Sequence, residues 1–281
     1  MKRMAALGAF DGVHRGHMKV IENAGPDCGV VFFEPVPRQM FGGLSWRKRL
    51  TTPAERYELL RGNGISSIIT LPFDEVTVAT TPQSFGRLLA EMGQFSGFAV
   101  GYDFRFGRDA SGSADTLRES LQQYGLTVTV VEPEDVEGVP VKSGKIRQLL
   151  LKGDLSGASY LLGRVYGATG VVSRGRGYGR TLGFPTLNIR VPWSKLLPLP
   201  GSYATFARIG CKRIMAVAFV VPERNLVEVH VPSLEGNVYG AEASVDFVSF
   251  IRAPARVDSE EMLKKLIKND LEKSMEVLRE W

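Results

Sequence analysis

Apolar runs and helical patterns alternate along the first half of the chain. Between the runs, the spacing of hydrophobic positions predicts helices over 17–22, 53–61, 81–92 and 113–124. Thr81, directly before Pro82, is a plausible cap for the third helix. This alternation predicts a parallel sheet with helices on both faces, which binds ligands at the carboxyl ends of its strands. The expected buried strands are 4–10, 29–33, 65–71, 97–101 and 126–131.

The pattern changes after Gly163. Two helices are expected before it, at 143–151 and 155–162, and after it glycine and proline divide short apolar runs that predict an antiparallel barrel or sandwich. Residues 259–278 have apolar positions at helical spacing, which favours a helix packed on the barrel over a partner-binding or membrane surface. We therefore expect an α/β domain at 1–158 and a β domain at 159–281. The expected strands of the second domain are 168–173, 201–209, 214–221, 226–231 and 243–251.

A glycine-rich run with two histidines occupies 8–17, at the end of the first expected strand. Glycines let the backbone approach phosphates closely, and a helix that starts just after them presents amides to an anion. His14 and His17 could contact a phosphate as neutral donors or as cations. A metal site is the rival interpretation, but His230 is the only other histidine, so zinc would need distant carboxylates. A purely structural glycine turn is the other alternative.

A second glycine-rich run, 175–188, lies in the β-rich half and contains Arg176 and Arg180. Thr186 and Asn188 are two residues apart, so in an extended chain they point to the same side and offer oxygen ligands suited to magnesium on a nucleotide. A hairpin with a glycine turn would explain the same run.

Further along, Glu228 and His230 share one face of an expected strand. A carboxylate at this position could act as a general base toward a substrate hydroxyl. An exposed strand face gives the same pattern, and the residues alone leave both interpretations open.

Composition and charge narrow the class of protein but identify no site residue. The chain has 44% hydrophobic and 23% charged residues, which is ordinary for a globular protein. No signal segment or membrane-spanning run is visible, so we expect a cytoplasmic protein. The net charge of +5 comes entirely from residues 159–281 and suits anionic small molecules as well as DNA. Cys28 and Cys211 are interpreted as reduced thiols.

Taken in order, these features resemble one family, the bifunctional bacterial riboflavin kinases and FAD synthetases, and the resemblance covers essentially all 281 residues. It implies a Rossmann-like nucleotidyltransferase domain with a parallel sheet, followed by a small antiparallel β-barrel riboflavin kinase domain with a C-terminal helix. It also implies two ATP-dependent steps, riboflavin to FMN and FMN to FAD, with release of pyrophosphate. The matching segments are 8–17, 33–37, 49–51, 100–107, 141–147, 162–164, 179–188, 228–230 and 239–240.

The resemblance also implies site residues, with Mg²⁺, ATP and flavin as the small molecules bound. The catalytic residues would be His14, His17, Arg147 and Glu228, with Glu228 accepting the proton of the riboflavin 5′-hydroxyl. ATP would contact Gly8, Phe10, Asp11, Gly16, Ser143, Gly179, Arg180 and Thr186. The flavin or adenosine would contact Asp103, Phe104, Arg105, Phe106 and Tyr239. Magnesium would be held through Thr186 and Asn188.

Three segments depart from the family pattern. Val36 stands where the family has a histidine, Lys142 and Gly144 stand where it has a serine and a threonine, and 221–224 lacks the family's asparagine, glycine and proline-threonine order. One alternative function is therefore an FMN adenylyltransferase whose kinase half only binds flavin. Another is a flavin-responsive nucleic-acid regulator, against which we find no recognition helix or aromatic RNA-binding motif. The expected partners are small molecules, without nucleic acid, membrane or an obligatory protein partner.

Overall fold

The structure, a computed structural model, describes residues 2–41, 47–175, 178–231 and 238–281. It divides the chain into two compact units, Met1–Ser143 and Gly144–Trp281. The domain boundary expected after residue 158 stays a prediction.

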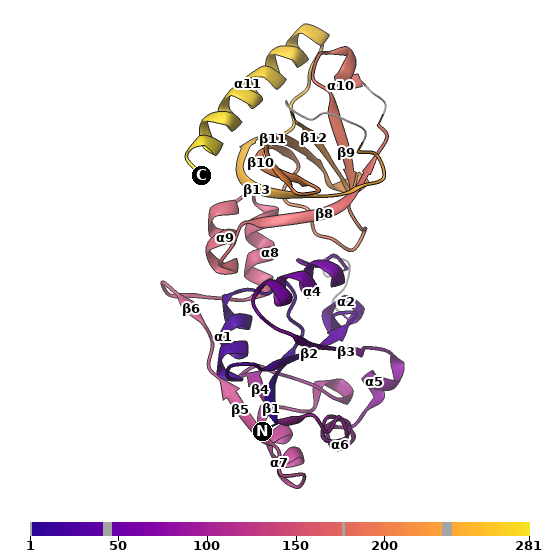
Figure 1. The fold of residues 1–281 in the computed structure, drawn as a ribbon, viewed down its shortest axis with the longest axis vertical. Coiled ribbons are helices and arrows are strands. Elements are labelled where there is room, and N and C mark those ends of the chain that lie inside the picture. The colour runs from indigo at the N-terminus through magenta and orange to yellow at the C-terminus, as the bar shows by residue number, and fades with distance from the viewer. Residues whose placement is uncertain (1, 42–46, 176–177, 232–237) are drawn as a thin grey trace. The chain divides into compact units, whose positions relative to one another are not determined.

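The first unit is built on a five-stranded parallel sheet in the order β3-β2-β1-β4-β5 (Figure 1). This confirms the parallel α/β prediction. The strands are β1 Arg3–Gly8, β2 Gly29–Glu34, β3 Ser67–Pro72, β4 Phe95–Gly101 and β5 Thr127–Val131. The helices are α1 Arg15–Asn23, α2 Pro37–Phe41, α4 Pro53–Gly62, α5 Glu75–Ala79, α6 Pro82–Glu91 and α7 Ala114–Gln122, with a 3-10 turn at Arg108–Ala110. A short hairpin joins β6 Asp135–Val136 and β7 Val139–Pro140.

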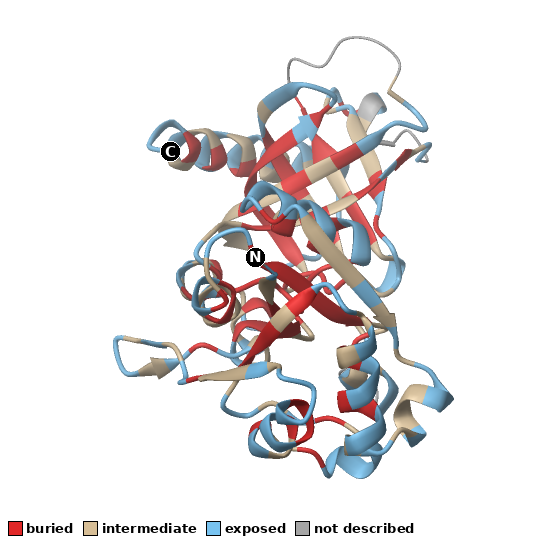
Figure 2. Ribbon diagram, turned by 60° about the horizontal axis from the view of Figure 1, so that its bottom comes forward, coloured by how far each residue is buried: buried red, intermediate tan, exposed pale blue. Residues whose placement is uncertain are grey.

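Alternate residues of each strand feed two hydrophobic cores, one on each face of this sheet. Phe98 of β4 packs with residues of α6 and α7 on one face, and Ala99 packs with residues of α1 and α4 on the other. Because successive side chains of a strand point to opposite faces, a continuous apolar run fills both cores. Figure 2 shows the buried residues concentrated along the strands.

Strand β1 ends at Gly8, so the sequence prediction of a strand up to residue 10 is wrong at its end. Phe10, Gly12 and Val13 all have positive φ, which breaks the extended backbone and turns it toward α1. Between β1 and β4 the strand order reverses, and in parallel sheets ligands bind outside the carboxyl ends of the strands at such a switch point. The histidine-containing turn lies there.

The second unit begins one residue into α8 Ser143–Leu151, includes α9 Leu155–Leu162 and continues into a closed six-stranded antiparallel barrel. The strands follow one another around it in the order β10-β11-β12-β9-β8-β13. They are β8 Tyr166–Ser173, β9 Thr186–Arg190, β10 Gly201–Ile209, β11 Lys212–Val221, β12 Leu226–His230 and β13 Glu242–Arg252. Short helical segments lie at α10 Tyr178–Thr181 and η2 Pro222–Arg224.

The last helix, α11 Glu260–Arg279, packs on the barrel as expected. Ser259 caps it by accepting a hydrogen bond from the Met262 amide. Near its middle, the carboxylate of Asp270 accepts two parallel hydrogen bonds from Arg252 of β13, 2.8 and 2.7 Å long. This fork joins the helix to the barrel wall.

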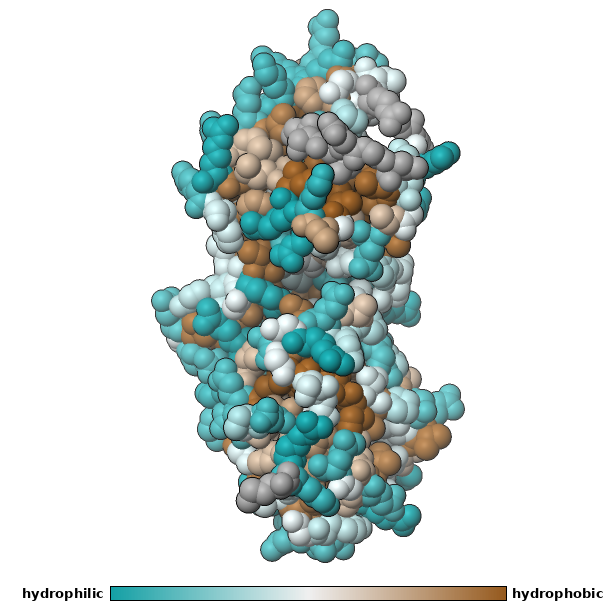
Figure 3. All heavy atoms as spheres, in the orientation of Figure 1, coloured by the Kyte–Doolittle hydropathy of each residue, from teal (hydrophilic) through white to brown (hydrophobic). Residues whose placement is uncertain are grey.

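Figure 3 shows hydrophobic side chains gathered on one face of the molecule where Figure 1 draws the barrel strands, with hydrophilic residues around them. Within the described residues, no helix is both long enough and apolar enough to cross a membrane.

Candidate active sites

The turn after β1 brings its two histidines together. His14 caps α1, and its Nδ1 accepts the backbone N–H of His17 at 3.2 Å. In return, Nδ1 of His17 accepts the backbone N–H of His14 at 3.4 Å. The two rings stack with their centroids 3.6 Å apart. Since both Nδ1 atoms accept hydrogen bonds, both neutral rings carry their proton on Nε2.

Other residues of this motif brace the turn. The carboxylate of Asp11 is buried and accepts the backbone N–H groups of Leu50 and Thr51 at 2.9 and 3.1 Å. Ser143, at the start of α8, donates to the carbonyl oxygen of Asp11 and accepts the Nε2–H of His14 at 3.2 Å. Asp11 thus acts on the shape of the turn, and Ser143 contacts His14. The contact of both residues with ATP, which the family resemblance implies, stays a prediction.

Glycine is required at position 12 of the turn, and position 16 leaves little room for a side chain. A Cβ on Gly12, whose φ is +93°, would lie 2.8 Å from Leu50, and one on Gly16 would lie 3.2 Å from the Val141 carbonyl and 3.3 Å from the His14 ring. A Cβ on Gly8 would lie 3.3 Å from the Phe10 ring. The glycines therefore serve close packing of the turn, and their expected contact with ATP stays a prediction.

A buried ion-pair network beneath this turn was not predicted from the sequence. Glu34, the last residue of β2, forms ion pairs with two arginines. Nη1 of Arg49 lies 2.8 Å from its carboxylate, and Arg56 binds the same carboxylate. The Arg56 side chain is fully buried and stacks on the Phe32 ring. Arg56 donates in addition to the carbonyl oxygen of Ala9 at 2.7 Å. Burial lowers the pKa of Arg56, and the Glu34 carboxylate opposes that shift. The network anchors the strand end from which the turn departs.

Replacing Glu34 with alanine should therefore destabilise the first unit by about 3 kcal/mol, because it leaves two buried guanidinium groups without their shared carboxylate. Thermal unfolding followed by circular dichroism measures this. Glu91→Ala, which removes the partner of exposed Arg87, is the matched control and should change little. Equal melting temperatures for the two variants would contradict the role given to Glu34.

The segment after β4 reaches the same edge of the sheet. Asp103 is exposed and lies 3.4 Å from the ammonium of Lys142, whose pKa is raised by the Tyr102 side chain and by Asp103. Phe106 is buried in the core and stacks on Phe104 at 5.6 Å between centroids. Among the residues expected to contact flavin, Phe106 can thus act only by supporting Phe104.

The remaining residue of that group, Arg105, is exposed and donates to the carbonyl oxygen of Phe104 at 3.0 Å. Contact of this segment with flavin or adenosine stays a prediction.

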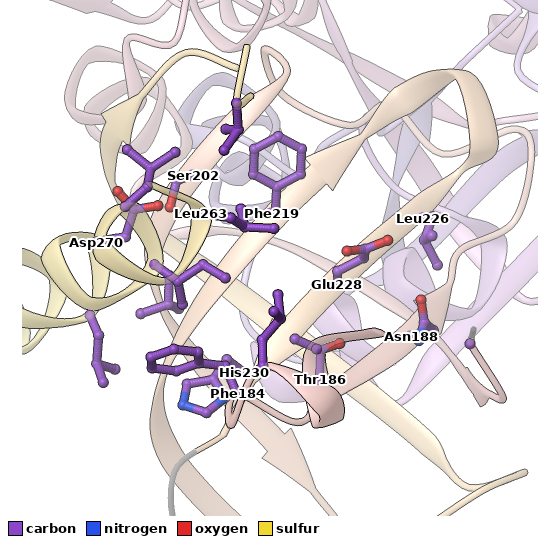
Figure 4. Close-up of a pocket in the computed structure, with 18 of the residues that line it drawn as sticks. Phe184, Thr186, Asn188, Ser202, Phe219, Leu226, Glu228, His230, Leu263 and Asp270 are labelled. Carbon is purple, nitrogen blue, oxygen red and sulfur yellow. The ribbon is translucent and has the colours of Figure 1, made fainter. Parts of the chain in front are cut away.

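The second unit holds a pocket of about 1300 Å³ between the outer face of the barrel and α11. Antiparallel pairing sets Thr186 opposite His230 and Asn188 opposite Glu228, and all four line the pocket (Figure 4). Paired residues project to the same side. The barrel thus brings Thr186 and Asn188 together with Glu228 and His230, which follow 40 residues or more later in the chain. Glu228 has no hydrogen-bond or ion-pair partner among the described residues, which leaves its carboxylate available to a ligand.

His230 holds the segment that leads to Thr186. Its Nδ1 lies 2.8 Å from the carbonyl oxygen of Pro185, and because a carbonyl can only accept, Nδ1 carries the proton here. Its ring also meets Phe184 edge to face at 5.7 Å between centroids. His230 therefore positions Pro185 and Thr186 rather than completing a metal site.

The glycine-rich run packs against β9 and the residues just before it. A Cβ on Gly175 would lie 2.1 Å from Nδ2 of Asn188, and one on Gly179 would lie 2.5 Å from the Phe184 carbonyl. The Arg180 side chain and residues 176–177 lie outside the described part of the chain. Tyr239 is exposed, with the Arg174 guanidinium 5.5 Å from its ring centroid.

Arginines that were not predicted line this pocket too. They are Arg174, Arg190, Arg224 and Arg252. Arg224 comes from η2, the segment where the sequence departs from the family pattern, so this different loop contributes a cation to the pocket. No sequence signal marks these positions, because each is an ordinary charged residue of a strand or turn.

The donor atoms fit magnesium bound through a nucleotide. Thr186 and Asn188 offer a hydroxyl and an amide oxygen, which are hard ligands. Within the described residues, no three His, Cys, Asp or Glu side chains gather into a group that could hold a metal. An ion carried mainly by ATP phosphates needs only such neutral oxygen ligands.

Arg147, expected to act in adenylyl transfer, is buried in α8 of the second unit. Its contact with ATP stays a prediction.

Comparison with known proteins agrees with this division. Residues 1–145 match the FAD synthetase family and residues 162–278 match the riboflavin kinase family. The bifunctional riboflavin kinase/FMN adenylyltransferase of Escherichia coli (strain K12) is 32% identical over 279 residues, covering 94% of this chain and 89% of that protein. The enzyme of the same name from Bacillus subtilis (strain 168) is 29% identical over 291 residues, covering 98% and 92%.

Among solved structures, one described as a macrolide-efflux protein from Streptococcus pneumoniae superposes with a TM-score of 0.83 at 26% identity. The superposition covers 100% of this chain and 95% of the Streptococcus pneumoniae chain. Its fold is thus the same over both units.

A parallel α/β unit with a glycine- and histidine-rich turn at its switch point, followed by a barrel with a carboxylate pocket, defines a two-site ATP-dependent transferase. The chain belongs to the family of bifunctional riboflavin kinase/FMN adenylyltransferases. It makes FMN from riboflavin and FAD from FMN, with ATP and flavins as its substrates. The resemblance found in the sequence is confirmed.

Proposed function

We propose that the two reactions use the two sites described above, with adenylyl transfer at the turn after β1 and phosphorylation in the barrel pocket. The observation that carries the proposal is the row of Thr186, Asn188 and Glu228 in one pocket of a unit that is separate from the histidine pair. Incubating the protein with riboflavin, ATP and magnesium and resolving FMN and FAD by chromatography tests both steps together.

In the first unit, His14 and His17 bind the phosphates of ATP. The Nε2–H of His17 acts as a neutral donor, and His14 acts together with Ser143, which accepts its Nε2–H. They stabilise charge on the α-phosphorus as the FMN phosphate attacks it and pyrophosphate leaves. The reciprocal backbone hydrogen bonds of the two rings fix their orientation before ATP arrives. Such preorganisation spares the rings from reorienting in the transition state.

In the barrel, Glu228 accepts the proton of the riboflavin 5′-hydroxyl as the hydroxyl oxygen attacks the γ-phosphorus of ATP. The bond from the γ-phosphorus to the bridging oxygen breaks, and ADP leaves with that oxygen. Thr186 and Asn188 would hold magnesium through their side-chain oxygens and keep ATP in place, and a bound magnesium ion would neutralise charge on the phosphates. Arg190 and Arg224 line the same pocket and favour the triphosphate by charge. Positioning and electrostatics are the main requirements of phosphoryl transfer.

The segment from Lys142 to Arg147 is proposed to hold ATP for adenylyl transfer. Arg147→Ala should nearly abolish FAD formation from FMN, because a guanidinium makes directional, forked contacts with phosphate. Lys142→Ala should mainly raise the KM for ATP, because an exposed ammonium supplies charge without direction. Steady-state kinetics with FMN as substrate measures both.

Restoring the family residues, Lys142→Ser with Gly144→Thr, should preserve or raise FAD synthesis. An active Arg147→Ala enzyme beside an inactive restored variant would show that this segment does not hold phosphate. We also propose that the enzyme works in the cytoplasm, where ATP and magnesium are at hand.

A further inference from the structure

The peptide between Ala9 and Phe10 lies where the extended backbone of β1 turns toward α1. This peptide bond is trans, and Phe10 has a φ of +51°, which aromatic residues rarely adopt. In a planar trans peptide, the direction of the Ala9 carbonyl sets the plane and with it the φ of Phe10. Rotation of the plane would return Phe10 to the favoured negative φ, so a contact must hold the carbonyl where it is.

The buried guanidinium of Arg56 supplies that contact. Its Nη1 donates to the carbonyl oxygen of Ala9 at 2.7 Å. Its Nη2 binds the Glu34 carboxylate, and its plane lies over the Phe32 ring, 3.9 Å from the ring centroid. Because the donors of a guanidinium have fixed directions, the carboxylate and the ring together aim Nη1 at Ala9. Arg56 thus fixes the plane of the peptide between Ala9 and Phe10.

The conformation of Phe10 in turn decides what the histidine pair contacts. The Phe10 ring is buried and lies 5.1 Å from the His17 ring between centroids, with the two planes inclined by 53°. On its own part, the His17 ring stacks on His14. A continuous chain of contacts therefore leads from Arg56 through the peptide and the Phe10 ring to the imidazole of His17.

We propose that Arg56 is a positioning residue for adenylyl transfer, which acts through Phe10 on the orientation of the His17 imidazole. The proposal rests on the assignment of adenylyl transfer to the turn after β1. Arg56 takes no part in the chemical step. Without its hydrogen bond the peptide is free to rotate, the Phe10 ring moves, and the imidazole loses one of the two rings that hold it.

The kinetic test is Arg56→Met, which removes the donor to Ala9 and keeps a long unbranched side chain. The kcat of FAD formation from FMN and ATP should fall about 10²-fold, the effect of misplacing a catalytic group by a small distance. The KM for FMN should stay near the wild-type value. Riboflavin phosphorylation in the same preparation should continue unchanged. Both assays are run at a temperature where circular dichroism shows the variant to be folded.

Arg49→Met is the matched control. Arg49 is also buried and pairs with the same Glu34 carboxylate. Its side-chain hydrogen bonds within the described part of the chain go to Glu34 and Gln39, and none reaches the turn. Both variants should lower the melting temperature, but Arg49→Met should keep the wild-type kcat of FAD formation. Equal falls in kcat for the two variants would show that the ion pairs only stabilise the fold, and would overturn the proposal.

The ring nitrogens of His17 give a readout that a loss of stability does not move. The chain has three histidines, so the ¹⁵N signals of His17 are identified by their loss in His17→Ala. In the wild type, Nδ1 of His17 accepts the His14 backbone N–H and the proton is on Nε2. Arg56→Met should give a mixture of the two tautomers, and Arg49→Met should keep the wild-type signals. Wild-type His17 signals in Arg56→Met would contradict the proposed role.

Phe10→Leu tests the same chain of contacts if Arg56→Met does not fold. It removes the ring that meets His17 and leaves the hydrogen bond between Arg56 and Ala9 in place. The His17 signals should change and the kcat of FAD formation should fall, as in Arg56→Met. Combining the two substitutions should lower kcat no further than one alone, because both act through one path. Unchanged His17 signals and a normal kcat in Phe10→Leu would overturn the proposal.

The activity of His17→Ala separates a failure of this inference from a failure of the proposed function. If His17→Ala loses FAD formation while Arg56→Met keeps a normal kcat, only the role of Arg56 is wrong. If His17→Ala also keeps FAD formation, the location of adenylyl transfer is wrong as well.

Discussion

Glu228→Gln is expected to lower the kcat of riboflavin phosphorylation about 10²- to 10⁴-fold, the usual contribution of a general base. The amide keeps the size and hydrogen-bonding shape of the carboxylate but cannot accept the hydroxyl proton. Since Glu228 has no polar partner among the described residues, the substitution should leave the barrel intact. FMN formation from riboflavin and ATP, followed by chromatography, measures the effect.

Glu223→Gln provides the control for the charge change, because Glu223 is exposed in η2 and does not line the pocket. ATP affinity should be nearly normal in both variants, and FAD formation from added FMN should continue. Near-normal FMN production by Glu228→Gln would identify Glu228 as an ordinary strand residue.

His17→Ala should abolish FAD formation while riboflavin phosphorylation continues. The substitution removes one of two stacked imidazoles at the switch point and also the acceptor of the His14 backbone N–H. The loss should therefore exceed that of a single phosphate donor, which alone is worth about 10²- to 10³-fold. Separate assays with riboflavin and with FMN measure the two steps in the same preparation.

Glu22→Ala changes an exposed residue of the same helix and should leave both reactions unchanged. A folded His17→Ala enzyme in which FMN formation falls as severely as FAD formation would contradict the assignment of separate sites. Circular dichroism and the melting temperature establish that the variant is folded.

Local rules account for most of the elements. Thr81 caps α6 with Pro82 at its first position, and Asp154 caps α9, because such caps depend only on residues a few positions apart. Residues 201–209 form the strand β10 with the expected bounds. Short segments without a clear period were missed, among them α2, α5, α10 and the β6–β7 hairpin.

The site residues also fall into those that local rules could group and those that only tertiary packing brings together. Thr186 and Asn188 could be predicted to share one side, because the alternation of side chains along a strand is a local property, and β9 confirms it. Glu34, Arg49 and Arg56 could not be grouped, since their meeting depends on how β2 packs with α4 and the loop before it.

The sequence by itself determined the alternation of strands and longer helices in the first unit, five of the six barrel strands, the position of the histidine turn at a strand end, and the family. Only the tertiary structure decided between a barrel and a sandwich, and it alone placed Thr186 and Asn188 opposite His230 and Glu228. The physical reason is that side-chain direction repeats every two residues along one strand, whereas the register between strands is set by barrel closure and by packing between distant residues.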